Sequence, residues 1–131
     1  LYLCLGFLLA PVMLGVILWK GVRNRGWWRH VGERFGLGAA VRPGGIWVHA
    51  VSVGEVQSCA SLVRALAQAR PDLPVTVTTF TPAGRERARA LLGDAVTHRY
   101  VPFDLAGAVH LFFARTRPRL AIIVETELWP N

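Results

Sequence analysis

Hydrophobic and polar positions change their spacing at residue 45 of this chain. Beyond that point, short apolar and β-branched runs alternate with longer segments whose apolar residues recur about every 3.6 positions. The short runs predict strands and the longer segments predict helices. The predicted order is strand 46–51, helix 55–69, strand 74–80, helix 82–92, strand 96–101, helix 105–115 and strand 120–125. Because strands and helices alternate with short connections, we expect an α/β fold with a parallel sheet and helices on both faces.

The first 19 residues follow a different pattern, since they are nearly all apolar and carry no charge. As a helix they rise about 1.5 Å per residue, just enough to cross a ~30 Å hydrocarbon layer. Tryptophan and basic residues follow, as at the cytoplasmic end of a membrane anchor: Trp19, Lys20, Arg23, Arg25, Trp27, Trp28, Arg29 and Arg34. We therefore predict an anchor helix over residues 1–20 and a basic juxtamembrane segment with a linker over 21–45. A buried core helix and a cleaved signal peptide are the alternatives, and the basic residues after the run favour the anchor over both.

The composition adds a strong basic excess to this picture. The formal net charge of the 131 residues is +7, and every basic residue except Lys20 is an arginine. Arginine binds phosphate and carboxylate groups in bidentate fashion, so we expect a phosphorylated or anionic partner. Nucleic acid is not expected, because only the net charge favours it and no aromatic stacking pattern accompanies it. Cys4 and Cys59 lack metal-ligand spacing, and we expect no metal site.

Distinctive polar residues collect directly after the predicted strands. Ser52, Gly54 and Glu55 follow the first strand, Thr79 and Thr81 end the second, and Glu125 and Glu127 end the last. The carboxyl ends of parallel strands meet at one edge of a sheet, where ligands bind in open α/β folds. We therefore expect Glu55 and Glu125 to face the same crevice.

The spacing of Ser52 and Glu55 allows three interpretations. Three positions apart at a helix start, they fit a capping box with a purely structural role. Alternatively, Glu55 is a general base that the helix dipole keeps ionised, and Gly54 lets a substrate approach the backbone. The third interpretation makes Ser52 the nucleophile of a hydrolase, because the segment resembles a G-x-S-x-G elbow with its first glycine replaced by Ala50. His49, in the preceding strand, is either a core histidine or a substrate contact.

Five blocks of sequence together resemble one known family. They are GERFG at 32–36, WVHAVSVGE at 47–55, VTTFTPAG at 77–84, YVPFD at 100–104 and ETELWPN at 125–131. In this order they resemble the N-terminal half of the bacterial 3-deoxy-D-manno-octulosonic acid (Kdo) transferases of lipid A assembly, and the resemblance covers the whole chain. It implies a Rossmann-like acceptor domain over 46–131, the first half of a GT-B glycosyltransferase whose donor domain is absent here.

The resemblance also implies an activity and roles for individual residues. CMP-Kdo is the expected donor substrate and a phosphorylated lipid A precursor the acceptor, with no metal or other cofactor, at the cytoplasmic face of the cell inner membrane. Glu55 is the expected proton acceptor and Glu125 the expected transition-state stabiliser. The expected substrate-binding residues are Ser52, Gly54, Thr79, Thr81 and Glu127. Residues 1–131 alone are expected to be inert. A membrane-anchored serine hydrolase using Ser52 is the first alternative, and a non-catalytic membrane-binding module is the second.

Overall fold

A computed structural model describes the backbone of residues 2–124 and the side chains of residues 11–12 and 14–124. In chain order the elements are α1 (Tyr2–Arg23), η1 (Arg25–Trp27), η2 (Val31–Phe35), β1 (Ile46–His49), α2 (Val53–Ala69), β2 (Val75–Thr79), α3 (Pro82–Leu92), η3 (Gly93–Ala95), β3 (Thr97–Tyr100), α4 (Ala106–Thr116) and β4 (Leu120–Ile123). The η elements are short 3₁₀ helices. Every strand and helix predicted beyond residue 45 forms, with ends that differ by a few residues.

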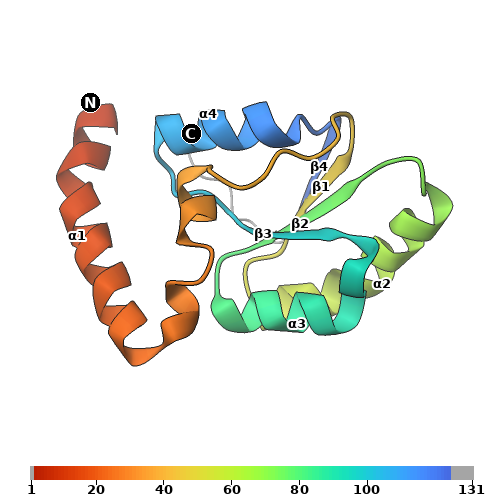
Figure 1. Cartoon of the computed structure of the whole chain (residues 1–131), viewed down its shortest axis with the longest axis horizontal. Coiled ribbons are helices and arrows are strands. Elements are labelled where there is room, and N and C mark those ends of the chain that lie inside the picture. Colours follow the sequence, from red (N-terminus) through yellow and green to blue (C-terminus); the bar gives the residue numbers. More distant parts are fainter. Residues whose placement is uncertain (1, 125–131) are drawn as a thin grey trace.

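The strands of the described region form one parallel sheet in the order β3-β2-β1-β4. In this sheet Val48 of β1 pairs with Val77 of β2 on one side and with Ile122 of β4 on the other. Helices α2 and α3 cover one face of the sheet and α4 covers the other (Figure 1). The predicted α/β fold is therefore confirmed, and its strand order matches the first four strands of a Rossmann-like sheet.

Residues of β1 are buried on both faces, which explains the nearly continuous apolar run. Val48 and Ala50 are fully buried in the core formed with α2 and α3. Successive strand residues point to opposite faces, and the Trp47 ring meets the rings of Phe112 and Phe113 of α4 with centroids 5.1 and 5.5 Å apart. Each face of β1 thus holds one helical layer in place.

The segment expected to be a juxtamembrane region and linker, residues 21–45, packs closely on the sheet. Within η2, the Glu33 carboxylate accepts hydrogen bonds from the Arg85 guanidinium and, at 2.8 Å, from the backbone N–H of Tyr100. The side chains of Glu33 and Arg85 are only 15 % and 9 % exposed. This nearly buried ion pair attaches η2 to α3 and β3.

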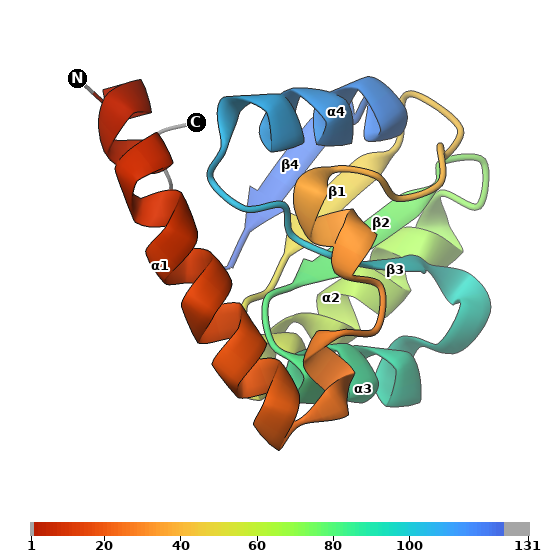
Figure 2. The same ribbon diagram turned by 60° about the vertical axis from the view of Figure 1, so that its left-hand side comes forward.

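Helix α1 runs three residues past the predicted anchor and lies beside the domain, alongside the edge at which the strands end (Figure 2). Leu14, Leu18 and Trp19 expose 51 %, 44 % and 60 % of their surface on it. Within the part of the chain that the structure describes, no helix has both the length and the apolar character needed to cross a membrane. The anchor role of α1 stays a prediction.

Replacing Glu33 by glutamine is expected to destabilise the fold by about 3 kcal/mol, because it leaves the charge of Arg85 buried without its partner. Urea denaturation of the purified protein measures this loss. The matched control is Asp72→Asn, which breaks the ion pair of Arg70 and Asp72, whose side chains are 52 % and 59 % exposed. Exposed pairs contribute little, so the control should leave the denaturation midpoint nearly unchanged. Equal effects of the two substitutions would contradict a structural role for the Glu33 pair.

Candidate active site

The ends of β1 and β2 and the starts of α2 and α3 meet at one point. The carbonyl of Val51 accepts the backbone N–H of Phe80 at 2.9 Å. Gly84, in the first turn of α3, lies so close to the backbone of Ser52 that an added Cβ would be 3.3 Å from it. Ser52 is the N-cap of α2, and Thr81 is the N-cap of α3. Two helix N-termini therefore lie side by side at the carboxyl edge of the sheet, as predicted from the positions of these residues after the strands.

Ser52 and Glu55 form the capping box that their spacing predicts. The Glu55 atom Oε2 accepts a hydrogen bond from the backbone N–H of Ser52 at 3.1 Å and another from the Ser52 hydroxyl. Both of these donors reach the same carboxylate oxygen. The structural interpretation is therefore correct for the local geometry, and it does not exclude a chemical role.

The hydrogen bond from the Ser52 hydroxyl is the main cause that lowers the pKa of Glu55 below its ordinary value of 4.5. The backbone N–H of Glu55 and, to a lesser extent, that of Ser52 and the nearby His49 act in the same direction, whereas desolvation opposes them. The first turn of a helix favours negative charge as well. Glu55 is therefore an ionised, partly exposed carboxylate at neutral pH.

A buried polar network lies next to this carboxylate on β1 and β2. The Trp47 Nε1–H donates to Thr78 Oγ1 at 2.8 Å, and Nδ1 of His49 is 2.9 Å from the same oxygen. If the hydroxyl donates its own hydrogen to Nδ1, the proton of a neutral His49 ring is on Nε2. His49 is 3 % exposed, and so it fits the core-histidine interpretation while still influencing Glu55.

The predicted substrate-binding residues take different positions. Gly54 is exposed, and a Cβ added there would meet nothing within 4 Å, so the space above the start of α2 is open. Thr81 Oγ1 accepts the backbone N–H of Gly84 at 3.0 Å. Thr79 is buried, and among the described residues its hydroxyl has no hydrogen-bond partner.

Glu125 and Glu127 lie outside the described residues. The backbone N–H of Val124 donates to the carbonyl of His49 at 2.9 Å, so the chain is still paired with β1 one residue before Glu125. Their predicted roles stay predictions. Among the side chains that the structure describes, no three His, Cys, Asp or Glu residues are grouped so that they could hold a metal ion.

The sequence prediction was wrong about Arg34, which it placed among the basic residues of the membrane surface. Arg34 is fully buried, and its Nη2 donates to the carbonyl of Phe80 at 2.8 Å. Its guanidinium carbon lies 4.0 Å from the ring centroid of Tyr100 and 4.7 Å from that of Trp27. Aromatic faces attract the cation once it is out of water, which is why this arginine is found inside. Burial is the largest influence and lowers the pKa of Arg34 to about 10, so the side chain stays charged at neutral pH.

The geometry gives no support to the hydrolase interpretation. The side-chain partner of the Ser52 hydroxyl is Glu55, whereas the serine of a Ser-His-Asp triad is bonded to a histidine base. The Nδ1 atom of His49 is taken by Thr78. His98 is bonded to the carbonyl of Gly93 at the opposite end of β3.

Comparison with known proteins gives a consistent result. A family model described as 3-deoxy-D-manno-octulosonic-acid transferase (kdotransferase) matches residues 29–131. The 3-deoxy-D-manno-octulosonic acid transferase of Haemophilus influenzae is 42 % identical over 133 residues, which cover 99 % of this chain and 31 % of the relative. The transferase of Bordetella pertussis is 36 % identical over 134 residues, which cover 94 % of this chain and 31 % of the relative. A probable mitochondrial transferase of the same name from Arabidopsis thaliana is 35 % identical over 133 residues, which cover 100 % of this chain and 30 % of the relative. The chain spans about three tenths of the length of these curated relatives.

Replacing Ser52 by alanine should raise the pKa of Glu55 towards its ordinary value, because the hydroxyl is the main cause of its low pKa. The lowered pKa stabilises the fold above the pKa of the unfolded chain, and this contribution is lost as pH falls through the folded value. The stability difference between wild type and Ser52→Ala, about 1 kcal/mol at pH 7 for a lost cap, should therefore shrink below about pH 4.5. Denaturation curves measured at several pH values test this.

Thr81→Ala is the control for this experiment. It removes the cap of α3, whose hydroxyl accepts only a backbone N–H, and so its cost should not depend on pH in the same range. A stability difference for Ser52→Ala that is equally independent of pH would contradict the described coupling to Glu55.

Proposed function

Because this chain belongs to the 3-deoxy-D-manno-octulosonic-acid transferase family, we propose that it forms the acceptor side of a glycosyltransferase that transfers Kdo from CMP-Kdo to a lipid A precursor. The Rossmann-like sheet is one half of a GT-B architecture. Donor binding is assigned to the part of the protein outside these residues, since the relatives are about three times as long. Residues 1–131 alone then supply one wall of the active site.

The observation that carries this proposal is the ionised Glu55 carboxylate beside the open start of α2. A hydroxyl of the acceptor sugar attacks the anomeric carbon of CMP-Kdo and forms the new glycosidic bond. The bond from that carbon to the phosphate oxygen breaks, and CMP leaves with the electron pair. The proton of the attacking hydroxyl passes to the Glu55 carboxylate.

The surroundings of Glu55 support a role as base at neutral pH. Its lowered pKa keeps it ionised, although the same hydrogen bonds reduce its basicity. Gly54, with open space where a side chain would be, gives the acceptor access to the start of α2. In this proposal Thr79, Thr81 and Glu127 help to bind substrate, and Glu125 stabilises the transition state. Neither a metal nor another cofactor takes part.

We place the protein at the cytoplasmic face of the cell inner membrane. The apolar run of residues 1–19 and the exposed apolar side chains of α1 support this, together with the basic residues that follow. No acidic residue precedes Glu33 in the sequence. Such a segment is attracted to anionic lipids and to a phosphorylated acceptor.

Glu55→Gln in the complete protein is expected to lower the rate of CMP release by a factor of about 10² to 10⁴, the usual contribution of a general base. The rate is measured with CMP-Kdo and lipid A precursor in detergent. Glu86→Gln, which changes an exposed carboxylate on α3, is the matched control and should keep the wild-type rate. A folded Glu55→Gln enzyme with nearly normal transfer would show that Glu55 acts only as a helix cap.

The complete protein is expected to sediment with membranes and to stay there after a high-salt wash. Salt screens the attraction between arginines and anionic lipids, whereas it does not release an inserted apolar helix. Membrane fractionation at low and high salt measures both contributions. Recovery in the supernatant at low salt would rule out the proposed location, and release only at high salt would mean that charge alone holds the protein.

A further inference from the structure

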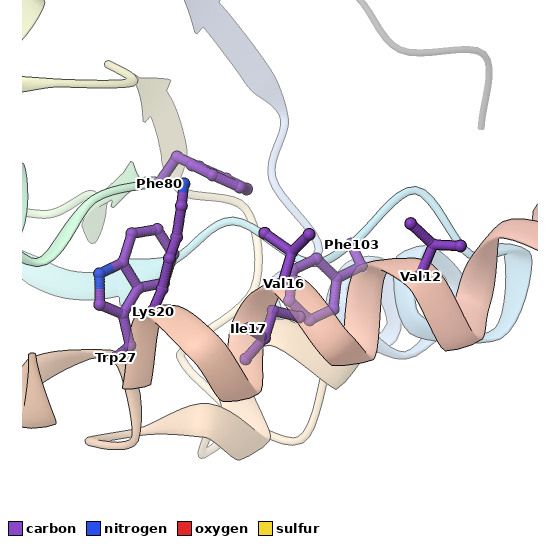
Figure 3. A pocket seen from close by; sticks show the side chains of 7 residues that line it. All are labelled: Val12, Val16, Ile17, Lys20, Trp27, Phe80 and Phe103. Carbon is purple, nitrogen blue, oxygen red and sulfur yellow. The ribbon is translucent and has the colours of Figure 1, made fainter. Parts of the chain in front are cut away.

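An elongated cavity of about 200 Å³ lies between α1 and the loops that follow β2 and β3. Its walls are Val12, Val16, Ile17, Lys20, Trp27, Phe80 and Phe103. Figure 3 shows Lys20, Trp27 and Phe80 at one end and Val12 at the other. Because the α1 residues span eight positions, the cavity extends about 12 Å along the helix. The cavity is open to the surface along α1, where Val12 and Val16 are 60 % and 46 % exposed, and its volume has room for several carbons of a linear apolar group.

The wall formed by the two phenylalanines is held firmly by Arg34. The carbonyl of Phe80 accepts a hydrogen bond from Arg34 Nη2, and the carbonyl of Arg34 accepts the backbone N–H of Phe103 at 2.8 Å. The guanidinium carbon lies 5.2 and 5.7 Å from the centroids of the two rings. These contacts position the backbone of both phenylalanines and place their rings around the Arg34 guanidinium.

Lys20 supplies a positive charge in the wall at one end of the cavity. The ammonium of Lys20 is 4.8 Å from the centroid of the Trp27 ring. Arg23, Arg25 and Arg29 are exposed on the same stretch of chain, and the sequence contains no acidic residue before Glu33. An apolar channel with cations at one end is complementary to an amphiphile with an anionic head. The exposed apolar side chains elsewhere on α1 indicate that this amphiphile arrives from a lipid layer.

From these observations we infer that the cavity receives one acyl chain of a phosphorylated lipid, with the phosphate next to Lys20. The inference rests on the proposed function and assigns a site for one chain of its lipid acceptor. Phe80 connects this cavity to the candidate active site, because its backbone N–H is bonded to Val51, one residue before Ser52. A lipid seated in the cavity therefore lies against the loop that leads from the end of β2 to the start of α3.

The test uses the complete protein in phosphatidylcholine nanodiscs and, as the probe, dodecyl phosphate with a diazirine at the end of its chain. After irradiation, mass spectrometry locates the label. We expect saturable labelling of Val12, Val16 or Phe103, which line the part of the cavity away from Lys20, with unlabelled dodecyl phosphate competing at lower concentration than dodecanol. Labelling confined to other residues overturns the inference, and equal competition by dodecanol overturns the role of Lys20.

Two matched tryptophan variants sharpen the test. Val16→Trp fills the cavity and should weaken probe binding at least tenfold, since each excluded methylene changes affinity about fourfold. Val22→Trp places the same ring on α1 at a residue that is 83 % exposed and does not line the cavity, and its binding should stay at the wild-type value. Equal weakening by both variants would mean adsorption to the outside of α1. If Val16→Trp does not fold, the residues that the probe labels in the wild-type protein decide whether the inference holds.

A second readout separates this inference from the proposed function. With an acylated acceptor, Val16→Trp should raise KM, whereas with the acyl-free phosphorylated disaccharide it should leave the wild-type KM. If Val16→Trp raises the KM of the acylated and of the acyl-free acceptor equally, the cavity is not an acyl-chain site. Absence of CMP release with every acceptor refutes the proposed function, and the labelling experiment still decides what the cavity binds.

Discussion

The arrangement of the site depends on the burial of one charged side chain, Arg34. A guanidinium out of water is costly unless its surroundings replace the lost hydration. Here four aromatic rings and the carbonyl of Phe80 surround it, and the neighbouring Glu33 pairs with Arg85. These contacts join η2 to the loops after β2 and β3. The same loops form one wall of the α1 cavity, and the loop after β2 leads directly into the start of α3.

The parallel sheet adds a second constraint, because it brings every strand end to one edge. The Phe80 N–H bonded to Val51 aligns the end of β2 with the end of β1, and Gly84 allows α3 to lie against Ser52. A substituent at Gly84 would separate these two helix starts. The position of Glu55 is thus set by backbone pairing and close packing as well as by its own capping hydrogen bonds.

The elements beyond residue 45 could be predicted because period-2 and period-3.6 patterns result directly from burial on a sheet or against a helix. The Ser52–Glu55 cap was likewise visible in local spacing. Arg34 was not, since a charged residue between glycines in a basic segment gives no sign of burial. Its position depends on Tyr100 and Phe103, which are far away in sequence. The cavity could not be predicted either, because its walls come from three separate segments.

A structural cap and a catalytic base are compatible roles for Glu55, and their combination has a physical reason. A long flexible carboxylate loses side-chain entropy when it is positioned for proton transfer, and the capping hydrogen bonds have already fixed it in the folded protein. Both of these bonds use Oε2. The cost is a lower pKa and a weaker base. Such a base suits a reaction in which the sugar hydroxyl loses its proton only as the bond to CMP breaks, because the proton becomes more acidic as the transfer proceeds.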